Sequence, residues 1–223
     1  MRERPSIRTR ARWALAVVVL AAVAAAPAAQ QGRHGRLFPP EDLPLLEGPD
    51  REEWQKPEQI MDALEIADGS TVADLGAGGG WFTVRLARRV GPNGLVYAED
   101  IQSEMIGSIT RRVQREGLQN VKPILGAADD PRLPEGQIDA VLIVDTYREL
   151  EDPVTLLRNV RRALSPNGRV GIVDFTMYGG GPGPEKGERV DRQKVIDDAA
   201  KAGLRLLKEG TFLRYQYLLV FGR

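Results

Sequence analysis

The chain has 223 residues, enough for one domain with a full hydrophobic core and an additional tail. Basic and acidic residues are equal in number at 31 each, so net charge gives no general reason to expect nucleic-acid binding. Cysteine is absent and His34 is the single histidine. This composition argues against disulfides, thiolate catalysis, a Ser-His-Asp triad and a histidine or cysteine metal site, so we expect no metal.

The first 28 residues have the layout of a secretory signal peptide. Five arginines and one acid precede fourteen apolar residues, and a small-x-small pattern follows at Ala26-Pro27-Ala28. The apolar stretch is shorter than the about 20 residues that a membrane span needs. We therefore expect export to the periplasm or the medium, with no stable membrane span in the mature chain. The alternatives are an uncleaved anchor through residues 13–29 and a misassigned start codon.

The rest of the chain is predicted to be an arm followed by one domain. Residues 29–50 are rich in glutamine, glycine, proline and charge, which predicts an extended arm. Residues 51–223 show neither an internal repeat nor a second domain. A helix is expected from Pro57, because proline suits the first helical position and apolar residues then recur on one face.

From residue 70 onward, short apolar strands alternate with amphipathic helices. Ser103 is expected to cap one helix, and the helix that begins at Pro153 is expected to end at a Pro-Asn-Gly turn. Strands that are apolar on both faces and separated by helices predict a doubly wound, Rossmann-like α/β sheet of seven strands, mostly parallel. The last two strands have no helix between them, so they are expected to form an antiparallel hairpin at one edge.

The stretch "VADLGAGGGWFTVRLA" joins the first strand to the first helix, where ligands bind in a doubly wound sheet. Glycine allows positive φ and lets a ligand contact the backbone. The pattern is D-x-G-x-G-x-G, formed by Asp74, Gly76, Gly78 and Gly80. Trp81 stands where a dinucleotide-binding loop has its third glycine, which argues against a pyrophosphate. An acid before the loop also suits a cationic amino-acid ligand better than a phosphate.

This pattern resembles the first motif of the class I S-adenosylmethionine-dependent methyltransferases. The segment "VYAEDIQSEMI" looks like the family's second acidic motif. By that alignment Asp100 accepts hydrogen bonds from the ribose hydroxyls, with Glu99 as the alternative. The resemblance covers roughly residues 41–223 and implies S-adenosyl-L-methionine as cofactor. The cofactor-binding residues that it implies are Trp54, Asp74, Gly76, Ala77, Gly78, Gly80, Asp100, Ile101 and Asp129.

Three positions leave alternatives open. The family has an acid for the adenine amino group in a "G-D-A" context, but Ala127 follows Gly126 here. Asp129, two residues late, either reaches the adenine or is a solvated turn acid. Arg148 stands where many relatives have histidine, which puts any proton-transfer role tied to that histidine in doubt. Trp54 either closes over the cofactor or anchors the arm.

Methyl transfer is an in-line displacement, so orientation is its main requirement, and a base is needed only if the acceptor loses a proton. The candidates for contact with the acceptor, as catalytic residues, are Asp145, Tyr147 and Arg148, with Glu149 and Asp174 as further ones. Arg148 and Glu149 would be non-catalytic if they only pair with each other. The glycine-rich loop from Thr176 is expected to be a lid on the acceptor side, or else a plain surface loop.

Three functions therefore compete. The first is a methyltransferase acting on a small molecule, with protein side chains as the second class of acceptor, because the chain shows neither a basic patch nor an aromatic ladder for nucleic acid. Similarity to quinone-biosynthesis methyltransferases supports a small acceptor only at the level of the fold. The second is a non-catalytic module that binds the cofactor after export. The third is an oxidoreductase that binds NAD.

Overall fold

The computed structural model describes residues 37–178 and 180–223. The chain divides into two units, Met1–Gly32 and Arg33–Arg223, and every element described below belongs to the second. The signal peptide predicted for residues 1–28 lies outside the described residues. Within the described ranges, none of the helices combines the length and the apolar character that crossing a membrane requires.

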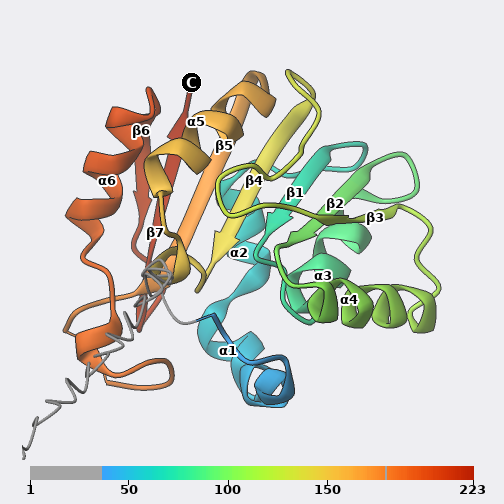
Figure 1. Ribbon diagram of the computed structural model, residues 1–223, viewed down its shortest axis with the longest axis horizontal. Coiled ribbons are helices and arrows are strands. Elements are labelled where there is room, and N and C mark those ends of the chain that lie inside the picture. Colours follow the sequence, from blue (N-terminus) through green and yellow to red (C-terminus); the bar gives the residue numbers. More distant parts are fainter. Residues whose placement is uncertain (1–36, 179) are drawn as a thin grey trace, which may run out of the picture. The chain divides into compact units, whose positions relative to one another are not determined.

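Seven strands form one sheet in the order β3-β2-β1-β4-β5-β7-β6 (Figure 1). Strands β1 to β5 pair in parallel, whereas β7 is antiparallel to both of its neighbours, β5 and β6. This confirms the predicted α/β class and the antiparallel C-terminal pair. The last strand lies inside the sheet and the sixth forms the edge. The bounds are β1 Thr71–Leu75, β2 Leu95–Asp100, β3 Val121–Leu125, β4 Ile138–Val144, β5 Leu164–Phe175, β6 Arg205–Gly210 and β7 Gln216–Gly222.

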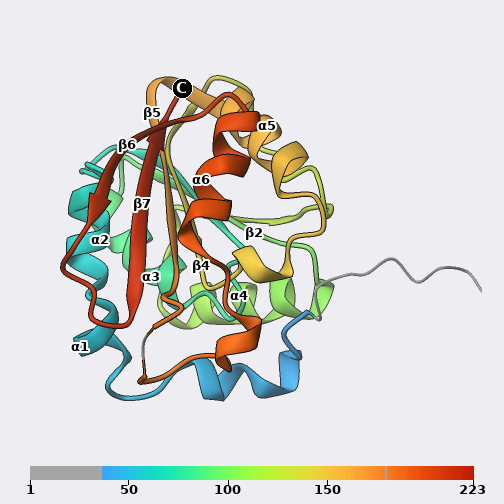
Figure 2. The same cartoon turned by 90° about the vertical axis from the view of Figure 1, so that its left-hand side faces the viewer.

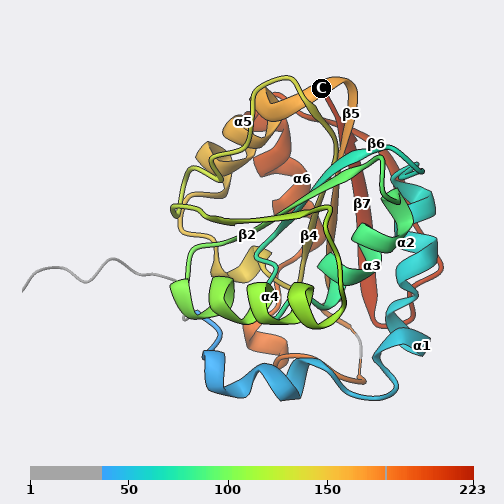
Figure 3. The same cartoon turned by 90° about the vertical axis from the view of Figure 1, so that its right-hand side faces the viewer.

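Helices cover both faces of the sheet, as the two turned views show (Figures 2 and 3). The side chains of α2, α3 and α4 pack on one face, and those of α5 and α6 pack on the other. The helix bounds are α1 Arg51–Gln55, α2 Pro57–Ala63, α3 Trp81–Val90, α4 Ser103–Arg115, α5 Pro153–Ala163 and α6 Arg192–Lys201. Three short 3-10 helices complete the described elements: η1 Pro40–Leu46, η2 Tyr147–Glu149 and η3 Lys186–Glu188.

Strand β4 shows why the sequences of the central strands are continuous apolar runs. Val141 and Ile143 belong to the core beneath α5 and α6. Ala140 and Leu142 belong to the opposite core beneath α2 and α3. Successive side chains of a strand point to opposite faces, so a strand that is covered on both sides needs apolar residues at every position.

Two predicted boundaries were wrong. Ser103 is the first residue of α4 and not its cap, and its hydroxyl donates to the carboxylate of Glu104 at 3.0 Å. The predicted Pro-Asn-Gly turn belongs to β5, where the register against β4 shifts after Leu164. A Cβ at Gly168 would lie 2.6 Å from the carbonyl oxygen of Ile138. The turn is therefore held against β4, and a glycine makes this close approach possible.

The described part of the arm lies against the carboxyl ends of the strands. Its backbone is held at Phe38, whose N–H donates to Glu149 at 3.1 Å and whose carbonyl accepts from the amide of Gln102 at 3.1 Å. The sequence predicts an extended arm here, and the structure adds the 3-10 helix η1. The arm thus passes over the edge of the sheet where ligands bind in this class of fold (Figure 2).

The packing of α5 predicts a large loss of stability for Leu157→Ala. Leu157 is 0% exposed, and removing its side chain leaves a cavity beneath the sheet. We expect the free energy of unfolding, measured by urea denaturation, to fall by about 2–5 kcal/mol. Leu125→Ala is the matched control, because Leu125 is 44% exposed and its truncation should cost much less. Equal losses in the two variants would contradict the described core.

Candidate functional site

A cavity of about 500 Å³ lies at the carboxyl ends of the central strands. Its volume is in the range of about 300–1,000 Å³ that is typical of small-molecule sites. It is lined by the arm, the glycine loop, the residues that follow β2 and β4, and part of the loop after β5. The predicted site residues that line it are Trp54, Asp74, Gly76, Ala77, Gly78, Asp100, Ile101, Asp145 and Arg148.

The glycine loop forms one wall of the cavity. Gly76, Gly78 and Gly80 have φ of 67°, 55° and 80°, a region that side chains with a Cβ rarely adopt. A Cβ at Gly76 would overlap the side chain of Thr146, so the loop after β1 packs directly on the segment after β4. Gly80 precedes α3 and does not line the cavity. Gly76 and Gly78 therefore shape the wall, and Gly80 turns the chain into the helix.

Two predicted acids are fixed to this loop. The Asp74 carboxylate accepts a hydrogen bond from the hydroxyl of Thr83 at 2.6 Å. Burial raises the pKa of Asp74 to about 6, although the Thr83 hydrogen bond opposes the rise. The Asp100 carboxylate accepts from the backbone N–H groups of Gly78 and Gln102, at 3.0 Å and 2.9 Å. Because Gly78 holds Asp100, the loop and the second acid form one unit.

Glu99 is a third acid at the same end of the sheet, and it lines the cavity too. The backbone N–H of Gly76 favours the charged form of its carboxylate. Burial, followed by the charge of Asp100, raises the pKa of Glu99 to about 8. A Cβ at Gly126 would overlap the Glu99 carboxylate. The glycine that begins the segment where the family has "G-D-A" therefore makes room for this acid. At neutral pH Glu99 is neutral.

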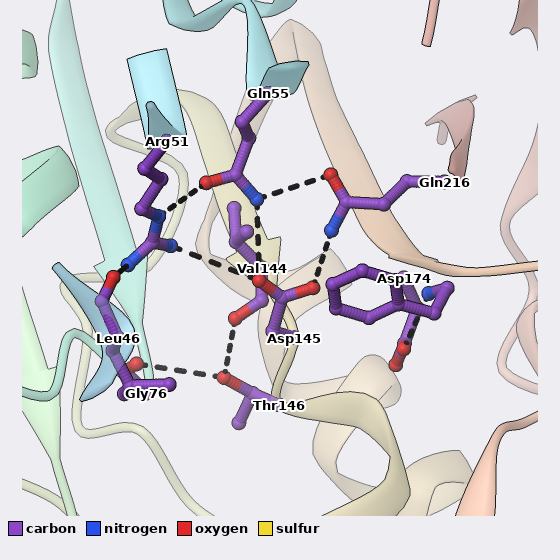
Figure 4. A network of polar contacts seen from close by, with 10 residues as sticks. Leu46, Arg51, Gln55, Gly76, Val144, Asp145, Thr146, Asp174 and Gln216 are labelled. Carbon is purple, nitrogen blue, oxygen red and sulfur yellow. Dashed lines mark hydrogen bonds and ion pairs between the residues drawn. The ribbon is translucent and has the colours of Figure 1, made fainter. Parts of the chain in front are cut away.

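Asp145 stands at the end of β4 in the left-handed region, with φ of 58°. Its carboxylate accepts hydrogen bonds from two amides, Gln55 at 3.2 Å and Gln216 at 2.5 Å (Figure 4). The guanidinium of Arg51 is 3.7 Å from the same carboxylate. Burial raises the pKa of Asp145, while these three partners and Arg148 oppose the rise. A non-glycine residue with positive φ persists only where its surroundings hold it, and such residues cluster at functional sites.

Arg51 and Gln216 are residues that the sequence analysis missed. Arg51 donates to the side-chain oxygen of Gln55 at 2.6 Å and to the carbonyl of Leu46 at 2.5 Å. Its guanidinium lies 4.4 Å from the ring centroid of Trp81. Gln55 had a signal in the sequence, because it directly follows Trp54 in the stretch "WQKP" that leads into the predicted helix. Gln216 offered no signal, because its contact with Asp145 joins positions 71 residues apart.

Asp174 is the penultimate residue of β5 and lies beside this network, but it does not line the cavity. One of its oxygens accepts from the backbone N–H of Phe175 at 2.7 Å. The other oxygen, Oδ2, is buried and has no hydrogen-bond partner among the described residues. Burial, followed by the charge of Asp145, raises the pKa of Asp174 to about 7. The two acids therefore differ in their role: Asp145 reaches the cavity, and Asp174 lies behind it.

Besides Gly80, two predicted site residues are not brought to the cavity, Tyr147 and Asp129. The hydroxyl of Tyr147 donates to Asp198 on α6 at 3.1 Å, and burial raises the pKa of this tyrosine above its usual range. The side chain of Asp129 is exposed, and Ala127 and Ala128 line the cavity in its neighbourhood. The structure thus favours the solvated turn acid over the adenine contact for Asp129. Tyr147 is a core residue because η2 turns its ring toward α5 and α6.

Arg148 and Trp54 both line the cavity and also have structural partners. Arg148 is 3.3 Å from Glu149 and 3.8 Å from Glu188, so the pairing considered for Arg148 with Glu149 does occur. The Trp54 ring packs 5.9 Å from Phe175, so this residue faces the cavity and anchors its own segment. Residues 182–184 of the glycine-rich loop line the cavity, while its action as a lid stays a prediction.

Comparison with known proteins agrees with this site. Residues 72–168 match the sequence model of a family described as "Methyltransferase domain". The chain is 32% identical over 115 residues to a demethylmenaquinone methyltransferase of Geobacillus stearothermophilus, across 52% of this chain and 48% of that enzyme. It is 33% identical over 122 residues to a ubiquinone/menaquinone biosynthesis C-methyltransferase of Pasteurella multocida, across 52% and 44%. The chain thus spans about half the length of the curated relatives it matches.

A solved structure is similar over a larger part. The crystal structure of a SAM dependent methyltransferase from Aquifex aeolicus superposes with a TM-score of 0.79 at 28% identity. The superposition covers 83% of this chain and 98% of the Aquifex chain. The sheet order and the match of residues 72–168 to the methyltransferase-domain model agree, and most of the chain is similar in structure to a SAM dependent methyltransferase.

Proposed function

We propose that this chain transfers a methyl group from S-adenosylmethionine to a small-molecule acceptor. The observation that carries the proposal is one cavity lined by the glycine loop, by the acid that the loop holds, and by Asp145. When bound, the cofactor supplies a methyl group that its sulfonium activates. The protein then has to bind, to orient and to exclude water.

The residues present fit the adenosyl part of this cofactor. Gly78 has no Cβ, and a Cβ placed there would meet only the side chain of Leu43, at 3.7 Å, so the loop backbone is open to a ligand. Each Asp100 oxygen accepts one backbone hydrogen bond. A carboxylate offers about four lone-pair sites, so two remain for the ribose hydroxyls. Burial raises the pKa of both acids, to about 8 for Glu99, but the backbone N–H groups of Gln102 and Gly78 oppose the rise for Asp100, so Asp100 is the better ribose acceptor.

The acceptor side is largely apolar. Phe38, Trp54 and Phe175 line it, and Asp145 and Arg148 are its charged groups near the end of β4. Walls of this kind exclude water and orient an apolar molecule, which supports a small acceptor. The relatives are named for methylation in quinone biosynthesis, and this agrees with such an acceptor. Asp145 would serve as the base for an acceptor that must lose a proton.

The ribose assignment predicts that Asp100→Ala weakens binding of S-adenosylmethionine and S-adenosylhomocysteine at least about tenfold, because hydrogen bonds to charged groups are each worth about 1.5–3 kcal/mol. Calorimetric titration of the full chain measures this, with NAD as a third ligand. Asp129→Ala should bind as the unmodified chain does. Binding of NAD without the adenosyl ligands would contradict the proposal and favour the oxidoreductase.

Binding alone does not separate an enzyme from a non-catalytic module. Transfer of a labelled methyl group from S-adenosylmethionine to a panel of phenolic and quinol acceptors makes that separation. Conversion of the cofactor to S-adenosylhomocysteine only in the presence of one acceptor supports the enzyme. Tight binding with no transfer to any extracted small-molecule fraction favours the non-catalytic module.

The raised pKa of Glu99 predicts how stability changes with pH. The folded state keeps a proton on Glu99 between pH 4.5, the ordinary value, and about pH 8, whereas the unfolded state releases it. Stability from this group is therefore full below pH 4.5 and declines as pH rises toward 8. Between pH 5 and pH 9, Glu99→Gln should lose less free energy of unfolding than the unmodified chain, by a few kcal/mol at about 1.4 kcal/mol per pKa unit.

Urea denaturation at the two pH values measures this difference. Other buried acids also titrate in the window, and the comparison with Glu99→Gln cancels their contribution. Glu53→Gln, a change at an exposed acid of α1, is the control. An identical loss of stability in Glu99→Gln and the unmodified chain would show that Glu99 is not the buried neutral acid described above.

We also propose that the first 28 residues direct export, with an uncleaved anchor through residues 13–29 as the alternative. The support is the sequence pattern of a basic region, an apolar stretch and a small-x-small site. Fusion of the full chain to a reporter phosphatase that is active only outside the cytoplasm tests this. We expect activity that depends on residues 1–28, and N-terminal sequencing of the product should begin at Ala29. An inactive fusion would contradict export.

A further inference from the structure

The side chains around Asp145 form a hydrogen-bond network in which the donor and the acceptor of each bond are fixed. Arg51 only donates, so Gln55 must turn its amide oxygen toward it, at 2.6 Å. The amide nitrogen of Gln55 then donates to Asp145 at 3.2 Å and to the oxygen of Gln216 at 3.1 Å. Gln216 in turn must donate to Asp145, at 2.5 Å (Figure 4). These orientations leave Asp145 as the acceptor of the hydrogen bonds from both amides, Gln55 and Gln216.

This arrangement favours the ionised form of Asp145. A carboxylate accepts at both oxygens, whereas a protonated acid would place its O–H against an amide N–H group. Gln55 and Gln216 are 0% and 3% exposed, so water does not compete for their hydrogen bonds. They come from α1 and from the start of β7, and they are hydrogen-bonded to each other beside the end of β4. The left-handed conformation of Asp145 is thus held by residues from two separate elements, α1 and β7.

The charged and titratable groups that face Asp145 are Arg51 on α1, Arg148 and Glu149 on η2, Asp174 on β5 and Tyr217 on β7. Asp174 is half-protonated near neutral pH and Glu149 pairs with Arg148. If Asp145 were protonated, the charge of Arg51 would lose its largest compensation, with Glu47 and Asp74 left to oppose it, and would repel a cation in the cavity more strongly. An ionised Asp145 removes that repulsion.

Asp145 also stands beside the cofactor-binding loop. The next residue, Thr146, has its hydroxyl 3.4 Å from the carbonyl oxygen of Gly76, and a Cβ at Gly76 would overlap its side chain. Asp145 and the loop line the same cavity. The carboxylate therefore lies where the first glycine of the loop meets the end of β4.

We propose that Gln55 and Gln216 are positioning residues that hold Asp145 as an oriented carboxylate, and that this carboxylate balances the positive charge of the sulfonium of the methyl donor. The inference rests on the proposed function. The proposal implies that the site prefers the positively charged ligand as long as Asp145 is ionised. S-adenosylmethionine carries the sulfonium charge and S-adenosylhomocysteine does not, so only the first ligand should sense whether Asp145 is ionised.

The experiment measures the dissociation constants of both ligands for the full chain by calorimetry from pH 5 to pH 9. The readout is the ratio of the S-adenosylhomocysteine constant to the S-adenosylmethionine constant, in which effects common to both ligands cancel. We expect the ratio to fall as pH is lowered through the titration of Asp145. Asp145→Asn should lower the ratio about tenfold at high pH and remove most of its pH dependence.

The positioning residues are tested by Gln216→Met and Gln55→Met, which keep side-chain length and remove the donors. In each variant the ratio should fall at a pH about one unit higher, because a hydrogen bond to the carboxylate is lost. Gln216→Asn keeps an amide that is one methylene shorter and should give a smaller shift. Gln114→Met, at an exposed position of α4, is the matched control and should give the unmodified profile.

The outcomes separate the two levels of the proposal. Circular dichroism and the urea midpoint identify any variant that fails to fold, and the two glutamines provide independent tests. An unchanged pH profile in the folded Gln216→Met and Gln55→Met variants overturns the positioning role. Full pH dependence in Asp145→Asn overturns the role of the carboxylate. Failure of the unmodified chain to bind either ligand overturns the proposed function itself.

Discussion

The close approach of two loops is the constraint on which the rest of the site depends. Gly76 follows β1 and Thr146 follows β4, and there is no room for a side chain at Gly76 where they meet. Because β1 and β4 are neighbours in the sheet, their carboxyl ends emerge side by side (Figure 1). The glycine loop then turns toward Asp100 and holds it through Gly78. One packing contact thereby sets the positions of the predicted ribose acid and of Asp145.

Buried acids in this site differ in what opposes their desolvation. Burial raises the pKa of all four carboxyls, Glu99, Asp100, Asp145 and Asp174. Asp100 accepts two backbone hydrogen bonds, whereas its neighbour Glu99 has its pKa raised to about 8. Asp145 accepts from two amides and faces Arg51, whereas Asp174 has one oxygen without a described partner and a pKa raised to about 7. Hydrogen bonding to the charged form opposes desolvation, so it favours ionisation of Asp100 and Asp145 over that of their neighbours.

Much of the fold and part of the site could be predicted from sequence, because both depend on local patterns. Apolar runs on β4 and the glycine spacing after β1 are properties of neighbouring residues, and they identified the sheet class and the loop. Asp129 was placed by alignment within a segment that departs from the family pattern, and its side chain is exposed. Tyr147 stood next to good candidates in sequence, but η2 turns it into the core, where it contacts Asp198.

The sequence by itself determined the α/β class, the loop at the end of β1 and the acids at the carboxyl ends of the first two strands, since each arises from residues close together in the chain. Only the tertiary structure decided what surrounds Asp145. Gln216 reaches it because β7 inserts next to β5 instead of forming the sheet edge, and Gln55 reaches it because α1 lies over the end of β4. These contacts join segments far apart in sequence, so neither periodicity nor spacing carries a trace of them.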